Sequence, residues 1–383
     1  MIDQHQLRNL LGHLVEIDSV NPSLVPGARG ESAIAEFLSG WLRANRISPE
    51  VHEVAPGRPN VVARIGGQSG EETDALLIVA HLDTVGAGDM PDPFTPREEG
   101  GRLYGRGALD IKCGVAAMCA AAAAVVRDAI PLRKSLRIAA VVDEECNSLG
   151  TQSLCRQVRA ECAVVMEPTA LKLCVAHKGY AWLEVVTRGR SAHGSLPSVG
   201  RDAIRYMGRV LGSLDALEHK LATLPPHPLL GNASLHASLI SGGHEVSSYP
   251  LECRLEYERR TLPGESDAQV LGEANELLRG LERRDSEFSA TARLISSRPP
   301  YEISRHAPVA LAAAEAIREV IGDTEFCGMG FWTDTALLHA AGIPGVVFGP
   351  RGEGLHGADE YVDLESAAAC AEVLRRLILS QCA

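Results

Sequence analysis

Four short and nearly uninterrupted apolar runs alternate with longer segments along the chain. The longer segments repeat apolar residues at helical spacing over 113–128, 149–159 and 364–380, and the same spacing occurs over 6–17 and 31–44. Strands that are buried on both faces give uninterrupted runs, and their alternation with helices is typical of a mostly parallel α/β sheet flanked by helices. The predicted strands are 75–80, 136–142, 163–166 and 345–348.

The middle of the chain has a different pattern. Residues 181–188 and 251–259 alternate polar and apolar side chains, as antiparallel strands with one solvent-exposed face do. Helical spacing returns over 201–222 and 266–281. We therefore expect an α+β domain, with an antiparallel sheet and two helices, to be inserted into the α/β domain.

The chain is expected to cross between these domains where glycine and proline interrupt it. Lys178-Gly179 and Arg298-Pro299-Pro300 stand near the two changes of pattern. The predicted α/β domain therefore comprises residues 1–178 and 297–383, and the predicted inserted domain comprises residues 179–296.

Composition and charge indicate which kinds of partner this protein is not expected to bind. Hydrophobic residues make up 45% of the 383 residues and charged residues 22%, which is ordinary for a folded globular protein. Acidic residues outnumber basic residues by 49 to 37, so a broad surface for nucleic acid or anionic lipid is not expected. The uncharged segment 113–126 is shorter than the roughly 20 residues that span a bilayer, and the first residues do not form a secretory signal. We expect a cytoplasmic protein without nucleic-acid or membrane partners.

Candidate metal ligands follow each of the predicted parallel strands. The carboxyl ends of parallel strands lie along one edge of a sheet, where open α/β sheets bind their ligands. None of the ten cysteines belongs to a C-x-x-C pair, and histidines with carboxylates suit Zn²⁺, Mn²⁺ or Co²⁺. The candidates are His81, Asp83, Glu144, Glu145, Glu167 and His356, with Asp110 in the loop before the helix at 113–128.

The spacing within this group predicts separate roles for neighbouring residues. His81 and Asp83 are two positions apart, so an extended backbone would point both side chains to the same side. Asp83 could then accept a hydrogen bond from the far nitrogen of His81 and orient the ring. Glu144 and Glu145 are adjacent and would point in different directions, which allows one to bind metal while the other transfers protons.

The motifs around these residues resemble those of a known enzyme family. This is the co-catalytic metallohydrolase family of acetylornithine deacetylase, succinyl-diaminopimelate desuccinylase, aminoacylase and carboxypeptidase G. The motifs occur in the family's order and cover nearly the whole chain, although they do not name a substrate. They are His81-Leu-Asp-Thr-Val, Gly105-Arg-Gly-Ala-Leu-Asp110, Asp143-Glu-Glu145, Glu167-Pro-Thr, Gly189-Arg-Ser-Ala-His193 and Leu355-His356.

The resemblance implies a site for two divalent metal ions. His81 and Glu167 would hold one ion, Glu145 and His356 would hold the other, and Asp110 would bridge them. Zinc is expected first, with cobalt and manganese as the alternatives.

The same resemblance implies roles for the residues around the ions. Glu144 would be the general base, and Asp83 would stand behind His81. In the inserted domain, His193 would donate to the developing oxyanion, often in the active site of the partner subunit. Arg260 would bind the substrate carboxylate, because a guanidinium fork fits a carboxylate in a bidentate way. We therefore expect the inserted domain to act as a lid and to form a homodimer.

One segment departs from the family pattern. The family often has asparagine in the segment that runs here from Gly242 to Pro250, and this chain has Ser247 at that position. A hydroxyl group has fewer donors than an amide, so the contact to the substrate backbone differs.

The expected reaction is removal of the acyl group from an N-acyl amino acid. A dipeptidase or carboxypeptidase of the same family is the alternative, since its substrates also carry a carboxylate for Arg260. A free α-amine would need a nearby acid, and no motif supplies one. A second alternative is a catalytically inactive metal-binding protein, which would lack the base or a ligand, whereas this chain has all of them.

Other enzyme classes fit the sequence poorly. Gly352-Glu-Gly354-Leu-His-Gly357 matches G-x-G-x-x-G, but too few residues follow it for the β-α-β unit of a dinucleotide-binding domain. The chain has no G-x-S-x-G segment of a serine hydrolase and no H-E-x-x-H segment of a single-zinc protease.

Overall fold

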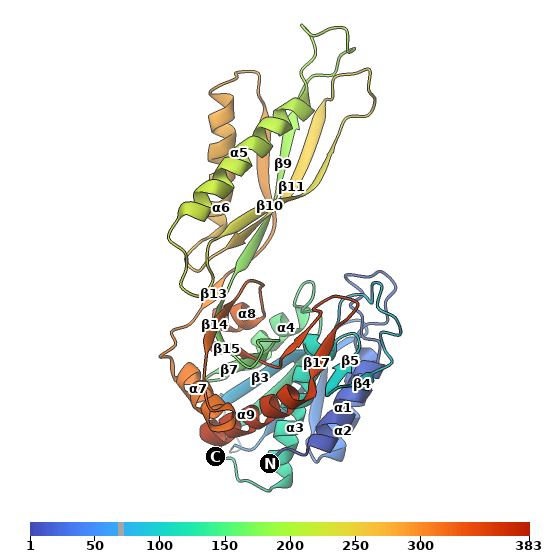
Figure 1. The fold of residues 1–383 in the computed structure, drawn as a ribbon, viewed down its shortest axis with the longest axis vertical. Helices are drawn as coiled ribbons and strands as arrows, with labels where there is room; N and C mark the ends of the chain where they lie inside the picture. Colours follow the sequence, from blue (N-terminus) through green and yellow to red (C-terminus); the bar gives the residue numbers. More distant parts are fainter. Residues whose placement is uncertain (68–72) are drawn as a thin grey trace. The chain divides into compact units, whose positions relative to one another are not determined.

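A computed structural model of the protein describes residues 1–67 and 73–383, which form two compact units (Figure 1). Unit 1 contains both termini and comprises Met1–Val175, Ile303–Cys327 and Thr333–Ala383. Unit 2 comprises Ala176–Glu302 and Gly328–Trp332.

The short segment Gly328–Trp332 differs from the predicted division, which placed all of 297–383 in the α/β domain. The backbone N–H of Lys178 donates to the carbonyl of Met329 at 3.0 Å, and Gly328 lies against Leu229. These contacts tie the segment to unit 2. They join residues far apart in the chain, so no local pattern in the sequence reveals them.

A large mixed sheet has the strand order β1-β2-β6-β3-β7-β15-β8-β13, and β14 pairs with β8. Most of this sheet belongs to unit 1, whereas β13 and the last residues of β8 and β14 are counted with unit 2. The strands β6, β3, β7 and β15 are parallel neighbours and coincide with the four predicted apolar runs. They are Leu136–Val141, Leu76–His81, Ala163–Met166 and Gly345–Phe348. The other strands are β1 (Pro49–Ala55), β2 (Arg58–Ile65), β8 (Leu173–His177), β13 (Tyr301–Glu302) and β14 (Phe326–Met329).

Helix α3 (Cys113–Arg127) is the central helix of unit 1 and packs against α9 (Leu364–Cys382) and α1. The longer stretch Ala108–Arg127, which includes α3, is apolar and long enough to cross a membrane, but 89% of its most apolar window is buried inside the protein. Alanine side chains let neighbouring elements approach closely, so α3 has the environment of a core helix. The other helices are α1 (Gln4–Glu16), α2 (Ser32–Ala44), α4 (Leu149–Gln157), α7 (Pro308–Ile321) and α8 (Thr335–Ala340).

A small antiparallel sheet in unit 1 was not predicted from the sequence. Its strand order is β16-β17-β5-β4, and its strands are too short to give a clear alternation of polar and apolar residues. In the register, Tyr104 of β5 faces Tyr361 of β17. This pairing brings the loop that carries Asp110 beside the segment that carries His356. The strands are β4 (Arg97–Glu99), β5 (Arg102–Tyr104), β16 (Gly352–Glu353) and β17 (Tyr361–Asp363).

Unit 2 contains an antiparallel sheet of order β10-β11-β9-β12, with α5 and α6 side by side along one face (Figure 1). Leu183 and Val185 of β9 point toward the helices and are buried, as the alternating pattern predicts. The predicted α/β fold with an α+β insertion is therefore confirmed. The elements are β9 (Gly179–Arg188), β10 (Ser234–Gly242), β11 (Glu252–Thr261), β12 (Ala290–Arg298), α5 (Ala203–Thr223) and α6 (Asp267–Glu282).

Candidate metal site in unit 1

The candidate ligands of unit 1 gather at the carboxyl ends of the parallel strands. Ligand atoms of His81, Glu144 and Glu167 lie within 4.8 Å of one another, and so do those of His81, Asp110 and Glu145. The two groups share His81. They come together because β3, β6 and β7 are parallel neighbours in register, which places the residues after each strand at one edge.

The carboxylate of Asp110 lies between two imidazole rings. Its Oδ1 is 3.2 Å from Nε2 of His81, and its Oδ2 is 3.3 Å from Nε2 of His356. The same nitrogen of His356 lies 3.4 Å from Oε2 of Glu145. Burial raises the pKa of Asp110, but the hydrogen bonds and the charges of His356 and His81 together outweigh burial, and the net pKa is lowered. Asp110 thus occupies the central place that the family resemblance implies for it.

The two adjacent glutamates diverge, as the spacing predicts. Glu144 lies with His81 and Glu167, whereas Glu145 lies with Asp110 and His356. Burial raises the pKa of Glu144 well above its usual value, and the charge of Glu167 raises it further. Burial also raises the pKa of Glu145, and its buried Oε1 has no hydrogen-bond partner among the described residues.

Asp83 contacts its neighbours differently from the prediction. The Nδ1 of His81 donates to the backbone carbonyl of Asp83 at 2.9 Å, whereas the carboxylate of Asp83 is 3.6 Å away. That carboxylate instead accepts the backbone N–H groups of Glu144 and Glu145, both at 3.1 Å, and the amide of Asn21 at 2.8 Å. Asp83 therefore orients His81 through its backbone and holds the turn of the two glutamates through its side chain.

A buried network that the sequence did not reveal supports the same turn. Asp143 has a positive φ of 69° and accepts hydrogen bonds from Arg58 at 2.7 Å and from Asn21 at 3.1 Å. Arg58 in turn donates to Glu31 at 2.9 Å. These partners come from three separate segments, and none stands in a motif, so only the fold identifies them. The network holds a strained residue in place directly before the two glutamates.

Asp334 is a further buried acid that sequence reasoning missed. Burial raises its pKa to about 6, while the hydrogen bond from the Thr151 hydroxyl opposes the shift. Its Oδ1 has no hydrogen-bond partner among the described residues. The negative charge of Asp334 also raises the pKa of Glu144. The cluster therefore contains more buried carboxylate than its basic groups neutralise, which suits a cation site.

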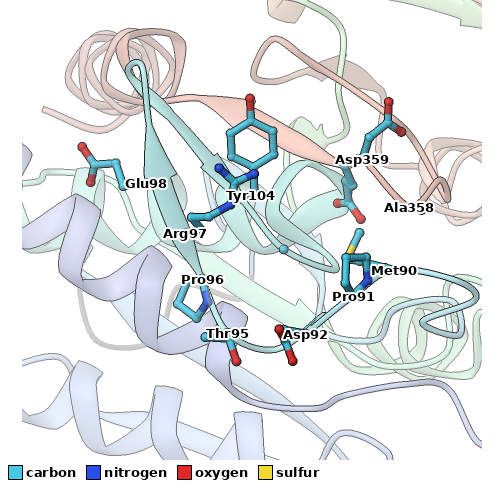
Figure 2. A pocket seen from close by; sticks show the side chains of 12 residues that line it. Met90, Pro91, Asp92, Thr95, Pro96, Arg97, Glu98, Tyr104, Ala358 and Asp359 are labelled. Carbon is cyan, nitrogen blue, oxygen red and sulfur yellow. The ribbon is translucent and has the colours of Figure 1, made fainter.

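A separate cavity of about 640 Å³ lies beside the small sheet of unit 1 (Figure 2). Figure 2 shows Tyr104 and Arg97 on one side of this cavity and Met90, Pro91 and Asp359 on another. Its lining contains none of the candidate ligands named above. The cavity is therefore distinct from the metal cluster.

His193 and Arg260, the candidates from the inserted domain, both belong to unit 2. His193 is exposed, and its Nδ1 lies 2.8 Å from the hydroxyl of Ser195. The next residue, Gly194, donates its N–H to the carbonyl of Ser247 at 2.7 Å. The residue that departs from the family pattern thus lies beside the loop of His193 and contacts it through its backbone.

The two adjacent arginines of β11 differ in their surroundings. Arg259 is buried and paired with Glu265 at 2.6 Å, so it belongs to the interior of unit 2. Arg260 is half-buried, and its Nε donates to Glu258 at 2.6 Å. Its guanidinium lies over the ring of Tyr180, with 5.6 Å between the central carbon and the ring centroid. Of the two residues, Arg260 is the one available to a ligand.

Comparison with known proteins adds a family context to this geometry. The family described as peptidase family M20/M25/M40 matches residues 77–380. An acetylornithine deacetylase of Edwardsiella ictaluri is 30% identical over an alignment of 367 positions that covers 90% of this chain and 90% of that protein. An N-formyl-4-amino-5-aminomethyl-2-methylpyrimidine deformylase of Bacillus subtilis is 26% identical over an alignment of 388 positions that covers 93% of this chain and 91% of that protein.

Solved structures share the fold over almost the full length. A tripeptidase of Staphylococcus aureus has a TM-score of 0.81 at 21% identity, covering 99% of this chain and 98% of that chain. A Bacillus subtilis protein described as a dinuclear metal binding peptidase has a TM-score of 0.74 at 17% identity, covering 99% of this chain and 98% of that chain. At these identities the likeness concerns the fold.

Proposed function

The chain belongs to peptidase family M20/M25/M40, and we propose that it removes the acyl group from an N-acyl amino acid by metal-dependent hydrolysis. As a member of this family it is a hydrolase of amide bonds. The observation that carries the proposal is the carboxylate of Asp110 between His81 and His356, at the strand ends where the family motifs meet.

The residues of the cluster fit two divalent ions. Imidazole nitrogens and carboxylate oxygens are the ligands that zinc prefers when thiolates are absent, and the buried Oε1 of Glu145 has no partner among the described residues. His81 and Glu167 would hold one ion, Glu145 and His356 the other, and Asp110 both. Two ions held there would polarise the carbonyl group of the substrate and lower the pKa of a bound water. We propose zinc as the metal, with cobalt or manganese as substitutes.

Glu144 is the proton carrier in this proposal. Its carboxylate takes one proton from the attacking water as the water oxygen bonds to the acyl carbon. The C–N bond then breaks, and Glu144 delivers that proton to the leaving nitrogen. Burial and the charge of Glu167 raise the pKa of Glu144. A raised pKa helps Glu144 to keep the proton between the attack of the water and the departure of the nitrogen.

His193 and Arg260 of unit 2 would bind the substrate. Arg260 uses its Nε for Glu258, and among the described residues its terminal nitrogens have no hydrogen-bond partner. They are suited to a bidentate contact with the α-carboxylate of an N-acyl amino acid. His193 is exposed and would donate to the oxygen of the scissile carbonyl as negative charge develops there.

We also propose that the protein is a cytoplasmic homodimer that assembles through unit 2. Strand β10 lies at the edge of its sheet and pairs with β11 alone. Its side chains Leu239 and Ile240 are 64% and 57% exposed. An exposed apolar edge strand readily pairs with a second copy of the chain, and such a partner could bring His193 to the other active site.

The acyl amino acid is favoured over a dipeptide because of the relatives with appreciable identity. The two curated relatives described above are a deacetylase and a deformylase, whereas the peptidases among the solved structures resemble this chain in fold alone. An acetyl or formyl group is small and uncharged, so its recognition needs no acid for a free α-amine. A dipeptidase would need one.

A direct comparison of substrates tests the proposed function. N-acetyl, N-formyl and N-succinyl amino acids and dipeptides would be hydrolysed side by side with Zn²⁺, Mn²⁺ or Co²⁺ added to metal-free enzyme. We expect kcat/KM to be highest for an N-acyl amino acid and to fall when its carboxylate is replaced by an amide. Higher kcat/KM for dipeptides would contradict deacylation, and no hydrolysis with any metal would support an inactive metal-binding protein.

A further inference from the structure

Two segments that carry candidate metal ligands exchange contacts through a buried ion pair. Arg106 belongs to the loop that ends at Asp110, and Glu360 belongs to the segment that begins at His356. Each of the two side chains of the pair is 1% exposed, and Nη1 of Arg106 lies 2.6 Å from Oε2 of Glu360. Arg106 stands in the Gly105–Asp110 motif without an assigned role, and Glu360 stands in none of the motifs.

Glu360 holds the backbone of the Asp110 loop. Its Oε2 accepts the N–H of Gly107 at 3.0 Å, and its Oε1 accepts the N–H groups of Leu109 at 2.9 Å and Asp110 at 3.1 Å. Gly107 has a φ of +81°, and a Cβ there would lie 2.7 Å from Thr84, so the loop needs glycine at this point. The carboxylate thereby accepts three backbone N–H groups of the turn that ends at Asp110, a candidate metal ligand.

Arg106 makes the reverse contacts. Its Nη2 donates to the carbonyls of Gly357 at 3.0 Å and of His356 at 3.3 Å. His356 has a positive φ of 58°, a conformation that non-glycine residues adopt only when their surroundings hold them there. Each segment therefore supplies the side chain that fixes the backbone of the other.

Stability alone is a weak explanation for this arrangement. Buried ion pairs often contribute little net free energy of unfolding, because removing two charges from water costs about as much as their attraction returns. Here the charged groups also make directional hydrogen bonds to the backbones of Asp110 and His356. The outer partners of metal ligands typically control metal affinity in this way.

We propose that Arg106 and Glu360 form a positioning clasp that sets Asp110 against His356 and thereby determines the affinity for one of the two metal ions. The clasp rests on the proposed function, since it presumes that these residues bind metal. The ion held by Glu145, His356 and Asp110 depends on both clasped segments. The ion held by His81 and Glu167 depends chiefly on β3 and β7 of the large sheet, so its affinity should change less.

Metal titration of the intact protein tests the clasp. Metal-free wild type and Glu360→Gln would be titrated with Zn²⁺ and with Mn²⁺ by calorimetry. The glutamine keeps the shape of the side chain but places an amide donor against the donors of Arg106 and Gly107. We expect two binding events in the wild type, and in the variant a loss of about 10–100-fold in affinity for one event and a smaller loss for the other.

Asp74→Asn is the matched control. Asp74 is also a buried acid that contacts two arginines, at 2.7 Å to Arg64 and 2.5 Å to Arg137, but it lies before β3, away from the carboxyl end. Its variant should keep both binding events. An equal loss of both events in Glu360→Gln and Asp74→Asn would assign the effect to general destabilisation and overturn the clasp.

A milder variant covers the case in which Glu360→Gln fails to fold. Arg106→Lys keeps the charge opposite Glu360 but cannot contact that carboxylate and the carbonyl of Gly357 at the same time. It should weaken the same event more than the other, and the visible absorption of the Co²⁺-loaded protein should change with it. If either variant folds and binds both ions with wild-type affinity, the clasp proposal is wrong, whereas the proposed binuclear site is unaffected. A wild type that binds a single ion would overturn the binuclear site and the clasp together.

Discussion

Glu144 of unit 1 and Glu184 of unit 2 are both largely enclosed by the protein, but their pKa values shift in opposite directions. In unit 1, burial raises the pKa of Glu144, and the nearby charge of Glu167 adds to the effect. In unit 2, the hydrogen bond from Arg293 lowers the pKa of Glu184, and Arg254 contacts the other side of the same carboxylate. The two side chains have the same chemistry, so the burial and the partners of each carboxylate decide the direction of its pKa shift.

This contrast distinguishes a site from a scaffold. In unit 2, arginines from the neighbouring strands β11 and β12 pair with Glu184 and neutralise its charge without any ligand. Unit 1 collects acids at the ends of adjacent strands and leaves buried oxygens of Glu145 and Asp334 without partners among the described residues. Excess negative charge of this kind is costly unless a cation binds.

The largest expected effect concerns the acid of unit 1. Glu144→Gln should lower kcat by about 10²–10⁴-fold while metal binding persists, because the amide cannot carry the proton. The matched control is Glu184→Gln in unit 2, which should keep wild-type kcat. Steady-state kinetics and metal analysis of both purified variants check this prediction. Near wild-type kcat in Glu144→Gln at full metal occupancy would contradict it.

The next effect concerns the arginines of unit 2. Arg260→Ala should raise KM for an N-acyl amino acid by about 10–100-fold, since a charge-assisted contact contributes about 1.5–3 kcal/mol. Arg254→Ala should leave KM unchanged, because Arg254 is paired with Glu184. With the corresponding N-acyl amino acid amide, Arg260→Ala and wild type should have similar KM values. A KM that rises equally for both substrates would remove the carboxylate contact from the proposal.

The next prediction concerns His177, a buried histidine of unit 2 whose protonation should make the stability of the protein depend on pH. Burial lowers the pKa of His177 to about 4, and its Nε2 has no hydrogen-bond partner among the described residues. As pH falls, the unfolded chain binds a proton at the ordinary pKa of 6.5 before the folded chain does. The stability contributed by neutral His177 is thus complete above pH 6.5 and is lost as pH falls toward 4.

At pH 5 the expected loss is about 2 kcal/mol of the free energy of unfolding. His177→Phe should remove this part of the pH dependence while keeping a ring beside Tyr301 and Trp332. His219→Phe is the control, because His219 is exposed on α5. Urea unfolding of the metal-free proteins at pH 7.5 and pH 5 measures the difference. If His177→Phe loses as much free energy of unfolding between pH 7.5 and pH 5 as the wild type, another group causes the pH dependence.

The smallest effect concerns exchange between subunits. If His193 acts in the partner's active site, a mixture of His193→Ala and Glu144→Gln chains should regain activity, because one site of each mixed dimer is complete. Equal mixing gives about half mixed dimers, so the expected recovery is roughly a quarter of wild-type activity. Light scattering and a tagged-chain assay would establish the dimer and the exchange. No recovery after proven exchange, or a fully active monomer, would contradict the prediction.

The sequence predicted what depends on neighbours in the chain. The apolar runs identified β3, β6, β7 and β15 because strands buried on both faces must be continuously apolar. The rule that parallel strands share an edge then predicted the meeting of His81, Glu145 and Glu167, which the structure places in overlapping groups. The alternating pattern of 181–188 likewise identified a strand of the second sheet.

Contacts between distant segments were decided only by the tertiary structure. Arg106 and Glu360 are 254 residues apart, Asn21 reaches Asp83 from the first loop, and Asp334 approaches Glu144 from another segment. No periodicity marks such residues, because a hydrogen bond between them depends on how strands pair and not on spacing along the chain. The sequence by itself therefore determined the four parallel strands, two strands of the second sheet, most of the long helices and the candidate ligand types of the site. The tertiary structure decided which buried acids receive a partner, because the cost of burying a charge depends on the groups around it in space.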